Sequence, residues 1–237
     1  MSKNKKERAQ QQAKQNLIST ITMATVILAA IGLGFFALFQ PGSDGKNDSA
    51  NQATVQKISY EGQPGTGNPN APVKLMEFGD FKCPACKYFH DEIYPQLKKD
   101  YIDTGKVQMF FTNYQFIGED SVTAGMAGEA VYHQNKDAFW KFYEAIYTHQ
   151  GNEADVWATP EFLTELVKKN VPNIDINKLS QDLNNKTYEK AVLEDNQMAR
   201  SLKIEGVPAL FINGKNVGEI SGYEELKKMI DEELKKK

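Results

Sequence analysis

The two cysteines of this 237-residue chain, Cys83 and Cys86, are separated by two residues and lie where the sequence pattern changes. An apolar run from Val73 to Phe78 predicts a strand ahead of them, and an amphipathic pattern that begins at Pro84 predicts a helix after them. A proline is tolerated at the first helical position because its missing N–H has no partner there. A cysteine pair with this spacing at a strand-to-helix corner indicates redox chemistry.

Outside this corner, the apolar pattern alternates between strand and helix spacing. The residues ahead of the first strand, 41–72, are rich in Gly, Ser, Asn and Pro and predict a flexible stalk with a short edge strand at 54–60. Pro95 is expected to kink or break the first helix because it removes a backbone donor. Further strands are expected at 107–114, 209–213 and 216–220, and further helices at 121–133, 137–150, 160–169, 176–184, 188–202 and 223–236.

This order of elements predicts an α/β fold into which an all-helical domain is inserted. A β-α-β unit comes first, a long helical block follows, and the chain ends with a helix, a β-hairpin and a last helix. The predicted boundaries are 55–118 for the first part of the α/β domain, 119–186 for the helical insertion and 187–237 for the second part.

The N-terminal region predicts a membrane anchor. Residues 1–16 form a basic tail, and residues 17–39 carry no charge and are nearly all apolar or small. At about 1.5 Å per residue, this segment is long enough to cross a hydrocarbon core of about 30 Å. The basic residues ahead of it place the N-terminus in the cytoplasm and the body outside, joined by a linker at 40–54. A cleaved signal peptide is the alternative, although its apolar region is normally only about 7–15 residues long.

Charge and cysteine usage exclude two other roles. The formal net charge is −3, and because the N-terminal tail is basic, the remaining body is acidic and has no basic stripe. This argues against nucleic acid as a partner. Thiols can persist as disulfides outside the cytoplasm. A single pair with two residues between closes too small a loop to stabilise a fold, so a structural disulfide is a poor explanation.

Cys83 is the expected nucleophile because the free N–H groups and the dipole at the start of a helix favour a thiolate. A helix terminus contributes at most about 2 kcal/mol, which lowers a thiol pKa from about 8.5 to about 7. Lys82 and Lys87 are expected to add a smaller effect of the same sign, and Asp80 to oppose it. Cys86, one turn into the helix, is expected to be more buried and to act as the resolving thiol.

A metal site is another possible use of two closely spaced cysteines. Zinc needs four ligands, and the chain has no second cysteine pair. Cys86 and His90 are four residues apart on one helical face, which leaves a copper-handling role open. His133 and His149 lie on aromatic-rich helices and are expected to be packing or surface residues. We therefore assign no metal to the site.

Two motifs in this chain resemble the DsbA family of thiol:disulfide oxidoreductases. The first is Glu77–Cys86, with the sequence EFGDFKCPAC, and the second is Gly206–Gly214, with the sequence GVPALFING. The resemblance covers about residues 55–235 and implies a thioredoxin fold with a helical insertion. The predicted anchor is similar to that of the membrane-attached Gram-positive BdbD type. Such a protein is a single-pass protein of the cell membrane with an extracytoplasmic catalytic domain, and it needs no cofactor.

The resemblance also implies roles for individual residues. Cys83 is the nucleophile and Cys86 the resolving thiol. Pro208 is the cis-proline that faces the disulfide, and Val207 before it binds an extended substrate chain. Glu77 is a buried acid beneath the active site that exchanges a proton with Cys86. The alternative for Glu77 is a partly exposed carboxylate on a strand.

The two residues between the cysteines, Pro84 and Ala85, set an expectation for redox strength. Strongly oxidising members of the family carry histidine at the position of Ala85. A methyl group cannot stabilise the Cys83 thiolate by charge. The sequence therefore predicts a less depressed Cys83 pKa and a weaker oxidant than the histidine-containing type.

The leading functional hypothesis is donation of the Cys83–Cys86 disulfide to secreted or membrane proteins by thiol–disulfide exchange. The resemblance implies reduced proteins as substrates and a DsbB/BdbC-type quinone-linked membrane thiol oxidase as the partner that restores the disulfide. Two alternatives stay open: an extracytoplasmic disulfide reductase with the same cysteine chemistry, and a copper-handling thioredoxin-like module.

Overall fold

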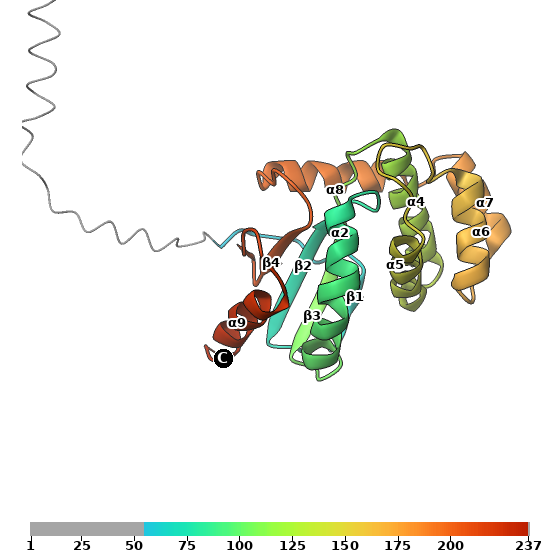
Figure 1. The fold of residues 1–237 in the computed structure, drawn as a ribbon. Coiled ribbons are helices and arrows are strands. Elements are labelled where there is room, and N and C mark those ends of the chain that lie inside the picture. The colour runs from blue at the N-terminus through green and yellow to red at the C-terminus, as the bar shows by residue number, and fades with distance from the viewer. Residues whose placement is uncertain (1–54, 237) are drawn as a thin grey trace, which may run out of the picture. The chain divides into compact units, whose positions relative to one another are not determined.

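The computed structural model describes residues 55–236, in which helices cover a mixed β-sheet (Figure 1). The sheet has five strands in the order β1-β3-β2-β4-β5. β2 and β3 run parallel, and β1, β4 and β5 each run antiparallel to their neighbours. The strands are β1 Gly65–Thr66, β2 Val73–Gly79, β3 Val107–Asn113, β4 Ala209–Ile212 and β5 Lys215–Asn216.

The three long strands confirm the sequence prediction, and the two sheet edges differ from it. Residues 55–60 form no strand. The segment makes a backbone hydrogen bond, from the Gln56 N–H to the Gly214 carbonyl at 2.8 Å, and packs through the buried Ile58 and the Tyr60 ring, 4.8 Å from that of Phe110. The edge strand is instead β1. At the other edge, β5 ends at Asn216, ahead of Gly218, which has a φ of 73°.

All the helices expected from the sequence are present, with ends shifted by no more than two residues in most cases. The first helical run, 84–102, alternates between α and π geometry. Pro95 lies inside it without breaking it, because the π segments on either side rearrange the backbone hydrogen bonds around the missing donor. The helices are α2 Pro84–Tyr88, η1 Phe89–Ile93, α3 Tyr94–Leu97, η2 Lys98–Ile102, α4 Glu119–Gln134, η3 Lys136–Ala138, α5 Phe139–Thr148, α6 Pro160–Asn170, α7 Ile176–Asn184, α8 Glu189–Ser201 and α9 Tyr223–Leu234.

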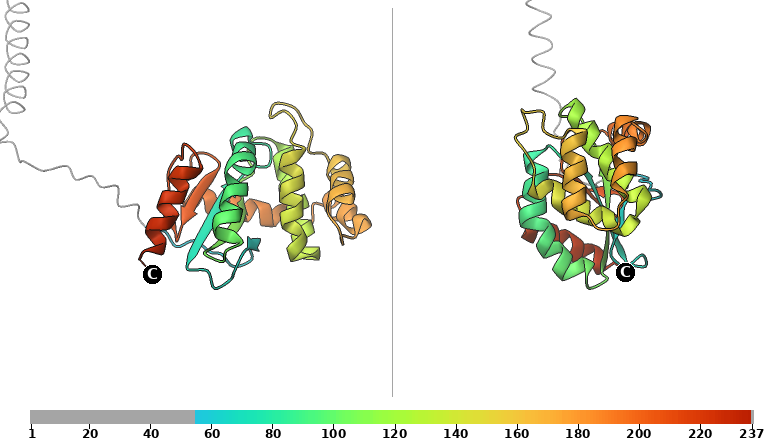
Figure 2. Two further views of the ribbon diagram at one scale, coloured as in Figure 1. Left: turned by 60° about the horizontal axis from the view of Figure 1, so that its bottom comes forward. Right: turned by 90° about the vertical axis from the view of Figure 1, so that its right-hand side faces the viewer.

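Both faces of the sheet are buried, which explains the continuous apolar runs in its central strands. Leu75 faces a large core that includes residues of α2 and α9, whereas its neighbour Met76 faces a smaller core that includes Ala199 of α8 and Ile204. Figure 2 shows α2 and α9 on one side of the sheet and α8 on the other. The alternation follows from the two-residue period of a strand.

The helices α4 to α7, which follow β3 in the chain, share the larger core with the sheet. Phe142 and Tyr143 of α5 belong to the same cluster of buried side chains as Leu75 and Phe111 of the sheet. The rings of Phe111 and Tyr143 are 5.6 Å apart and meet edge to face. The apolar core therefore runs without interruption from the sheet into the helical block.

The predicted basic tail, anchor and linker, residues 1–54, lie outside the described residues. Between residues 55 and 236, no helix is long and apolar enough to cross a membrane. The prediction of an anchor at 17–39 stays a prediction.

A buried ion pair joins the β2–α2 corner to the helical block. Lys82 Nζ lies 2.7 Å from Asp120 Oδ1, and the two side chains are only 3% and 7% exposed. Lys82 Nζ also donates to the Asp155 carbonyl at 2.9 Å, and Asp120 Oδ2 accepts hydrogen bonds from the backbone N–H groups of Trp157 and Ala158. Because buried charges need partners, this set of contacts fixes the corner against α4 and the loop at 155–158.

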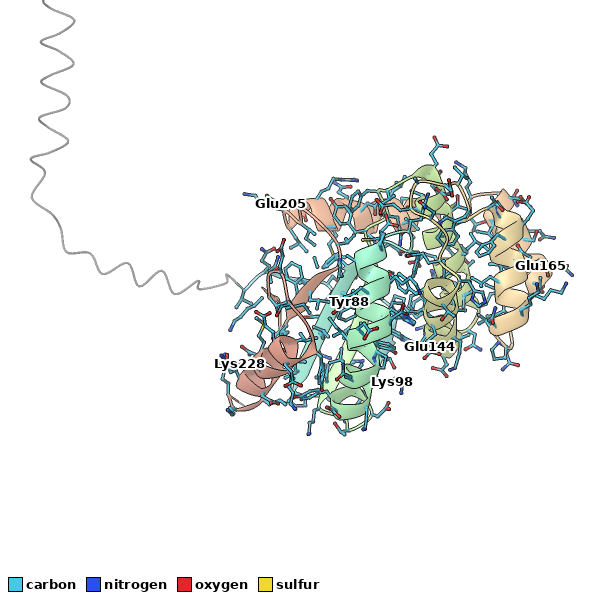
Figure 3. The ribbon with its side chains drawn as sticks, viewed as in Figure 1. Tyr88, Lys98, Glu144, Glu165, Glu205 and Lys228 are labelled. Atoms are coloured by element: carbon cyan, nitrogen blue, oxygen red, sulfur yellow. The ribbon has the colours of Figure 1, made fainter. Side chains whose placement is uncertain are left out.

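We expect Asp120→Asn to reduce the free energy of unfolding by about 3 kcal/mol, because it leaves the Lys82 ammonium group buried without its counter-charge. Urea denaturation at neutral pH measures this change. Glu144→Gln is the matched control: it neutralises a pair with Lys141 on the surface of α5 (Figure 3) and should cost less than about 0.5 kcal/mol. Equal losses of unfolding free energy in the two variants would contradict the stabilising role of the buried Lys82–Asp120 pair.

Candidate active site

Cys83 and Cys86 lie at the β2–α2 corner with different access to solvent. Cys83 is the N-cap residue of α2 in an extended conformation, and Pro84 occupies the first helical turn as predicted. Both cysteines are free thiols. Cys83 is 9% exposed, whereas Cys86 is fully buried. Cys83 is therefore the sulfur that a second protein can reach.

The pKa of Cys83 is lowered to about 7, chiefly because the Cys86 thiol donates a hydrogen bond to its sulfur. The backbone N–H groups of Cys86 and Ala85 lower it further, while burial and the negative charge of Asp80 raise it. The value agrees with the sequence-based expectation of a moderately acidic thiol. The leading cause differs, since the sequence argument rested mainly on the helix terminus, and the structure gives the largest effect to the Cys86 thiol.

The two nearby lysines do not supply the expected help to the Cys83 thiolate. Lys82 binds Asp120 with its ammonium group, and Lys87 Nζ donates to the Tyr147 carbonyl at 2.8 Å and pairs with Asp91 at 2.9 Å. Each ammonium group is thus engaged by other partners. Proximity to Cys83 in the sequence did not predict these contacts, because a long lysine side chain can reach acceptors that lie away from the Cys83 sulfur.

Cys86 is held as a protonated thiol. Its burial, its hydrogen bond to Cys83 and the neighbouring charges of Cys83 and Glu77 all raise its pKa well above the usual value. A buried sulfur of this kind cannot leave or attack as a thiolate without a nearby proton acceptor or donor. The chemistry of the pair therefore depends on the acid beneath it.

Glu77 is that acid. It lies on β2, on the face of the sheet that carries the larger core, and is fully buried. The Tyr143 hydroxyl donates to Glu77 Oε2 at 2.8 Å, while Oε1 is buried without a hydrogen-bond partner. Burial raises the pKa of Glu77 to about 8. The alternative of a partly exposed strand carboxylate is wrong.

Val207 and Pro208 lie next to Cys83, although they are more than 120 residues away in the chain. The Cys83 thiol donates to the Val207 carbonyl at 3.5 Å, and the Val207–Pro208 peptide bond is cis, as expected. With Ala85, these residues line a groove of about 520 Å³ that also includes Leu210. The groove gives an extended chain a place beside the reactive sulfur.

The sequence reasoning missed the contribution of α5 to this corner. Gln150, just after α5, donates to the carbonyl groups of Phe81 and Cys83 at 2.9 and 3.0 Å. The Tyr147 hydroxyl donates to the Asp80 carbonyl at 3.4 Å. The dense aromatic pattern of residues 139–147 indicated a buried helix, but nothing in it indicated which residues it would contact.

His90 and His133 pack against aromatic rings, and His149 Nδ1 is 2.9 Å from the Ala145 carbonyl. His90 Nδ1 is 2.8 Å from Asp91 Oδ1, and its ring packs against Tyr143. His133 stacks on Tyr188 with ring centroids 4.8 Å apart. Within residues 55–236, no cluster of three or more His, Cys, Asp or Glu residues could hold a metal ion.

An accessible sulfur of lowered pKa beside a buried protonated one can exchange with the disulfides and thiols of another protein. Placed at the start of the first helix of this mixed sheet, the pair defines a thiol:disulfide oxidoreductase of thioredoxin fold.

Comparison with known proteins agrees with this class. A family model described as Thioredoxin matches residues 59–232. The probable disulfide bond formation protein D of Bacillus anthracis is 39% identical over 216 residues, which cover 91% of this chain and 95% of the relative. The chain belongs to the thioredoxin family, in its group of DsbA-like disulfide bond formation proteins of the BdbD type.

Further relatives share both sequence and fold. Disulfide bond formation protein D of Bacillus subtilis is 35% identical over 192 residues, which cover 81% of this chain and 86% of the relative. The crystal structure of oxidised BdbD from Bacillus subtilis matches with a TM-score of 0.73 and 36% identity, covering 77% of this chain and 98% of that one. The crystal structure of Chlamydia trachomatis DsbA matches with a TM-score of 0.67 and 25% identity, covering 74% of this chain and 93% of that one.

We expect Cys86→Ala to raise the pKa of Cys83 from about 7 toward the ordinary value of about 8.5, because the substitution removes the hydrogen-bond donor to the thiolate. Cys86→Ser is the matched variant: it retains a donor in a similar volume and should shift the pKa less. The rate of alkylation of Cys83 as a function of pH measures both values. An unchanged Cys83 pKa in the alanine variant would show that the hydrogen bond from Cys86 is not the main cause of the lowered pKa.

We expect Glu77 to make the free energy of unfolding fall as the pH rises. The folded chain holds the Glu77 proton up to about pH 8, whereas the unfolded chain releases it near 4.5. The stabilising effect of the neutral form is therefore complete below the unfolded pKa and is lost as the pH rises toward the folded pKa.

Glu77→Gln tests this by removing the titration in an isosteric side chain. Between about pH 5 and about pH 7, the wild type should lose about 3 kcal/mol more stability than the variant. Denaturant unfolding of both proteins at both pH values gives the change in the free energy of unfolding for each. Subtracting the change in the variant from that in the wild type removes the contribution of all other titrating groups. Parallel pH profiles for the two proteins would show that Glu77 is ionised throughout.

Proposed function

We propose that this protein acts as a dithiol oxidase, which donates the Cys83–Cys86 disulfide to proteins that fold outside the cytoplasm. The observation that carries the exchange chemistry of this proposal is the asymmetry of the pair. Cys83, with a pKa of about 7, is a good leaving group at neutral pH, whereas Cys86 has a pKa well above its usual value. The direction of the exchange, donation of a disulfide, is supported by the names of the relatives, disulfide bond formation protein D.

The reaction proceeds through two exchanges. A substrate thiolate attacks the Cys83 sulfur, the Cys83–Cys86 bond breaks, and Cys86 leaves and takes up a proton. A second substrate thiolate then attacks the substrate sulfur of the mixed disulfide, and Cys83 leaves as a thiolate. Two electrons pass from the substrate to the cysteine pair. The substrate gains a disulfide, and the protein becomes a dithiol.

Glu77 supplies the proton that Cys86 needs when it leaves. With a pKa of about 8, the carboxyl group is protonated at neutral pH, and its Oε1 atom is free of other partners. A fully buried thiolate is much more basic than this acid, so proton transfer from Glu77 to Cys86 is downhill. The Tyr143 hydroxyl fixes the carboxyl group by its bond to Oε2.

The substrate chain lies in the groove between Ala85 and the Val207–Pro208 segment. The groove borders Cys83, because Val207 lines it and the Val207 carbonyl is 3.5 Å from the Cys83 sulfur. Its walls combine apolar residues such as Leu210 and Ile220 with the charged Glu205 and Glu219. An extended segment around a substrate cysteine can therefore bind through its backbone and short apolar side chains.

The protein acts on the outer side of the cell membrane, held by the segment at 17–39, and a DsbB/BdbC-type membrane thiol oxidase restores its disulfide. The uncharged segment and the basic tail ahead of it support this placement. A membrane-impermeant thiol reagent applied to intact cells should label Cys83. Mass spectrometry of the membrane fraction shows whether the segment is retained.

The reduction potential decides the direction of the reaction. A reduction potential of about −120 to −180 mV, measured by equilibration with glutathione, supports the oxidase, and we expect the Cys83–Cys86 couple to lie near the weaker end of this range. The oxidised protein should also oxidise reduced ribonuclease A. Cys83→Ser should abolish this activity. A potential near about −270 mV together with rapid reduction of insulin would establish a reductase instead, and stoichiometric copper binding without turnover would establish a copper-handling module.

A further inference from the structure

Asp80 is a buried carboxylate that four donors surround. Its Oδ1 atom accepts hydrogen bonds from the Lys82 backbone N–H at 2.8 Å and the Ser121 hydroxyl at 2.9 Å. Its Oδ2 atom accepts from the backbone N–H groups of Phe116 and Ile117 at 2.8 and 3.1 Å. The side chain has no exposed surface. Because all four contacts are donors, the environment fits the ionised form of the carboxyl group.

The charge of Asp80 is not neutralised by a base. The adjacent Lys82 offers Asp80 only its backbone N–H, since its ammonium group is bound to Asp120 and to the Asp155 carbonyl. Burial raises the pKa of Asp80, and the four neutral donors act against that rise. The corner therefore contains a hydrogen-bonded but unpaired negative charge, in a position where water and salt screen it little.

Asp80 is hydrogen-bonded through its backbone to the residue that carries the reactive sulfur. The Cys83 backbone N–H donates to the Asp80 carbonyl at 3.0 Å, so the two residues close a tight turn. Besides the Lys82–Asp120 pair, whose opposite charges offset each other, the two titratable groups that contact the Asp80 backbone are neutral: the Tyr147 hydroxyl contacts its carbonyl, and the protonated Cys86 faces its backbone N–H. A negative charge here disfavours the Cys83 thiolate, in agreement with its effect on the pKa of Cys83.

We propose that Asp80 is a positioning residue whose buried negative charge limits the oxidising power of the Cys83–Cys86 pair. A thiolate at Cys83 stabilises the reduced protein, and a more stable reduced form makes a stronger oxidant. By opposing that thiolate, Asp80 shifts the equilibrium toward the disulfide. The same carboxylate holds the corner against Ser121 of α4 and against the segment after β3 through its hydrogen bonds. Asp80 therefore stabilises the fold at this corner and also weakens the oxidant.

The direction of the effect separates this role from a purely structural one. A residue that only holds the corner in place lowers stability and activity when it is replaced. Removal of a restraining charge instead lowers the pKa of Cys83 and makes the pair more oxidising. Both quantities are measured on the protein alone, without a substrate protein or a membrane partner, so they are independent of the physiological direction proposed above.

Asp80→Asn tests the inference in the full chain. We expect the pKa of Cys83 to fall by about half a unit, and the equilibrium with glutathione at about pH 8, where Cys83 is mostly a thiolate, to shift about threefold toward the reduced protein. Thiolate absorbance as a function of pH gives the first quantity, and the fraction of reduced protein in glutathione buffers gives the second. If the folded variant has an unchanged Cys83 pKa, or if its equilibrium with glutathione is unchanged or shifts toward the disulfide, the proposal is overturned.

Two matched variants control for disturbance of the corner. Asp80→Glu retains the charge, and Ser121→Ala removes one donor while leaving the charge in place. Neither should make the pair more oxidising, even where the free energy of unfolding falls. An equal threefold shift in Asp80→Glu would assign the effect to altered packing and overturn the proposal. If Asp80→Asn does not fold, Asp80→Ser provides a neutral side chain of smaller size for the same two measurements.

Discussion

Exclusion of water from the space beneath Cys83 is the condition on which the chemistry of this protein depends. Cys86 can keep its proton and donate a hydrogen bond to the Cys83 sulfur because it is fully buried. The same exclusion raises the pKa of Glu77 into the range in which a carboxyl group holds a proton at neutral pH. In contact with water, both groups would have ordinary pKa values, and the two sulfurs would lose the difference that separates nucleophile from resolving thiol.

The helical block supplies much of this dry environment. Tyr143 and Tyr147 of α5 close the space under β2, and Gln150 binds the backbone on both sides of Lys82. The reactive corner is thus built from two parts of the chain separated by about 60 residues. Because the apolar core is continuous from the sheet into these helices, the packing of α5 affects the acid–base properties of the cysteines directly.

Apolar patterning was sufficient to predict the main elements of the fold, because β2, β3 and β4 are nearly continuous buried runs and helices such as α5, α6 and α9 bury one face. It failed at the sheet edges, where β1 and β5 have two residues each and one or two hydrogen bonds decide the outcome. In the active site, spacing and resemblance located Cys83, Cys86 and Pro208. The sequence did not predict that the Lys82 ammonium group binds Asp120 or which donors surround Asp80. Both depend on contacts between segments that are far apart in the sequence.

The low exposure of Cys83 has a consequence for timing in the cell. A sulfur that is 9% exposed and contacts Val207, a residue that lines the groove, can be reached by a protruding, extended chain but not by a cysteine inside a finished domain. Under the proposed function, the conformation of the client decides whether it reacts. Oxidation is then confined to the interval between translocation and completed folding, and correctly matured proteins are spared without a separate recognition signal.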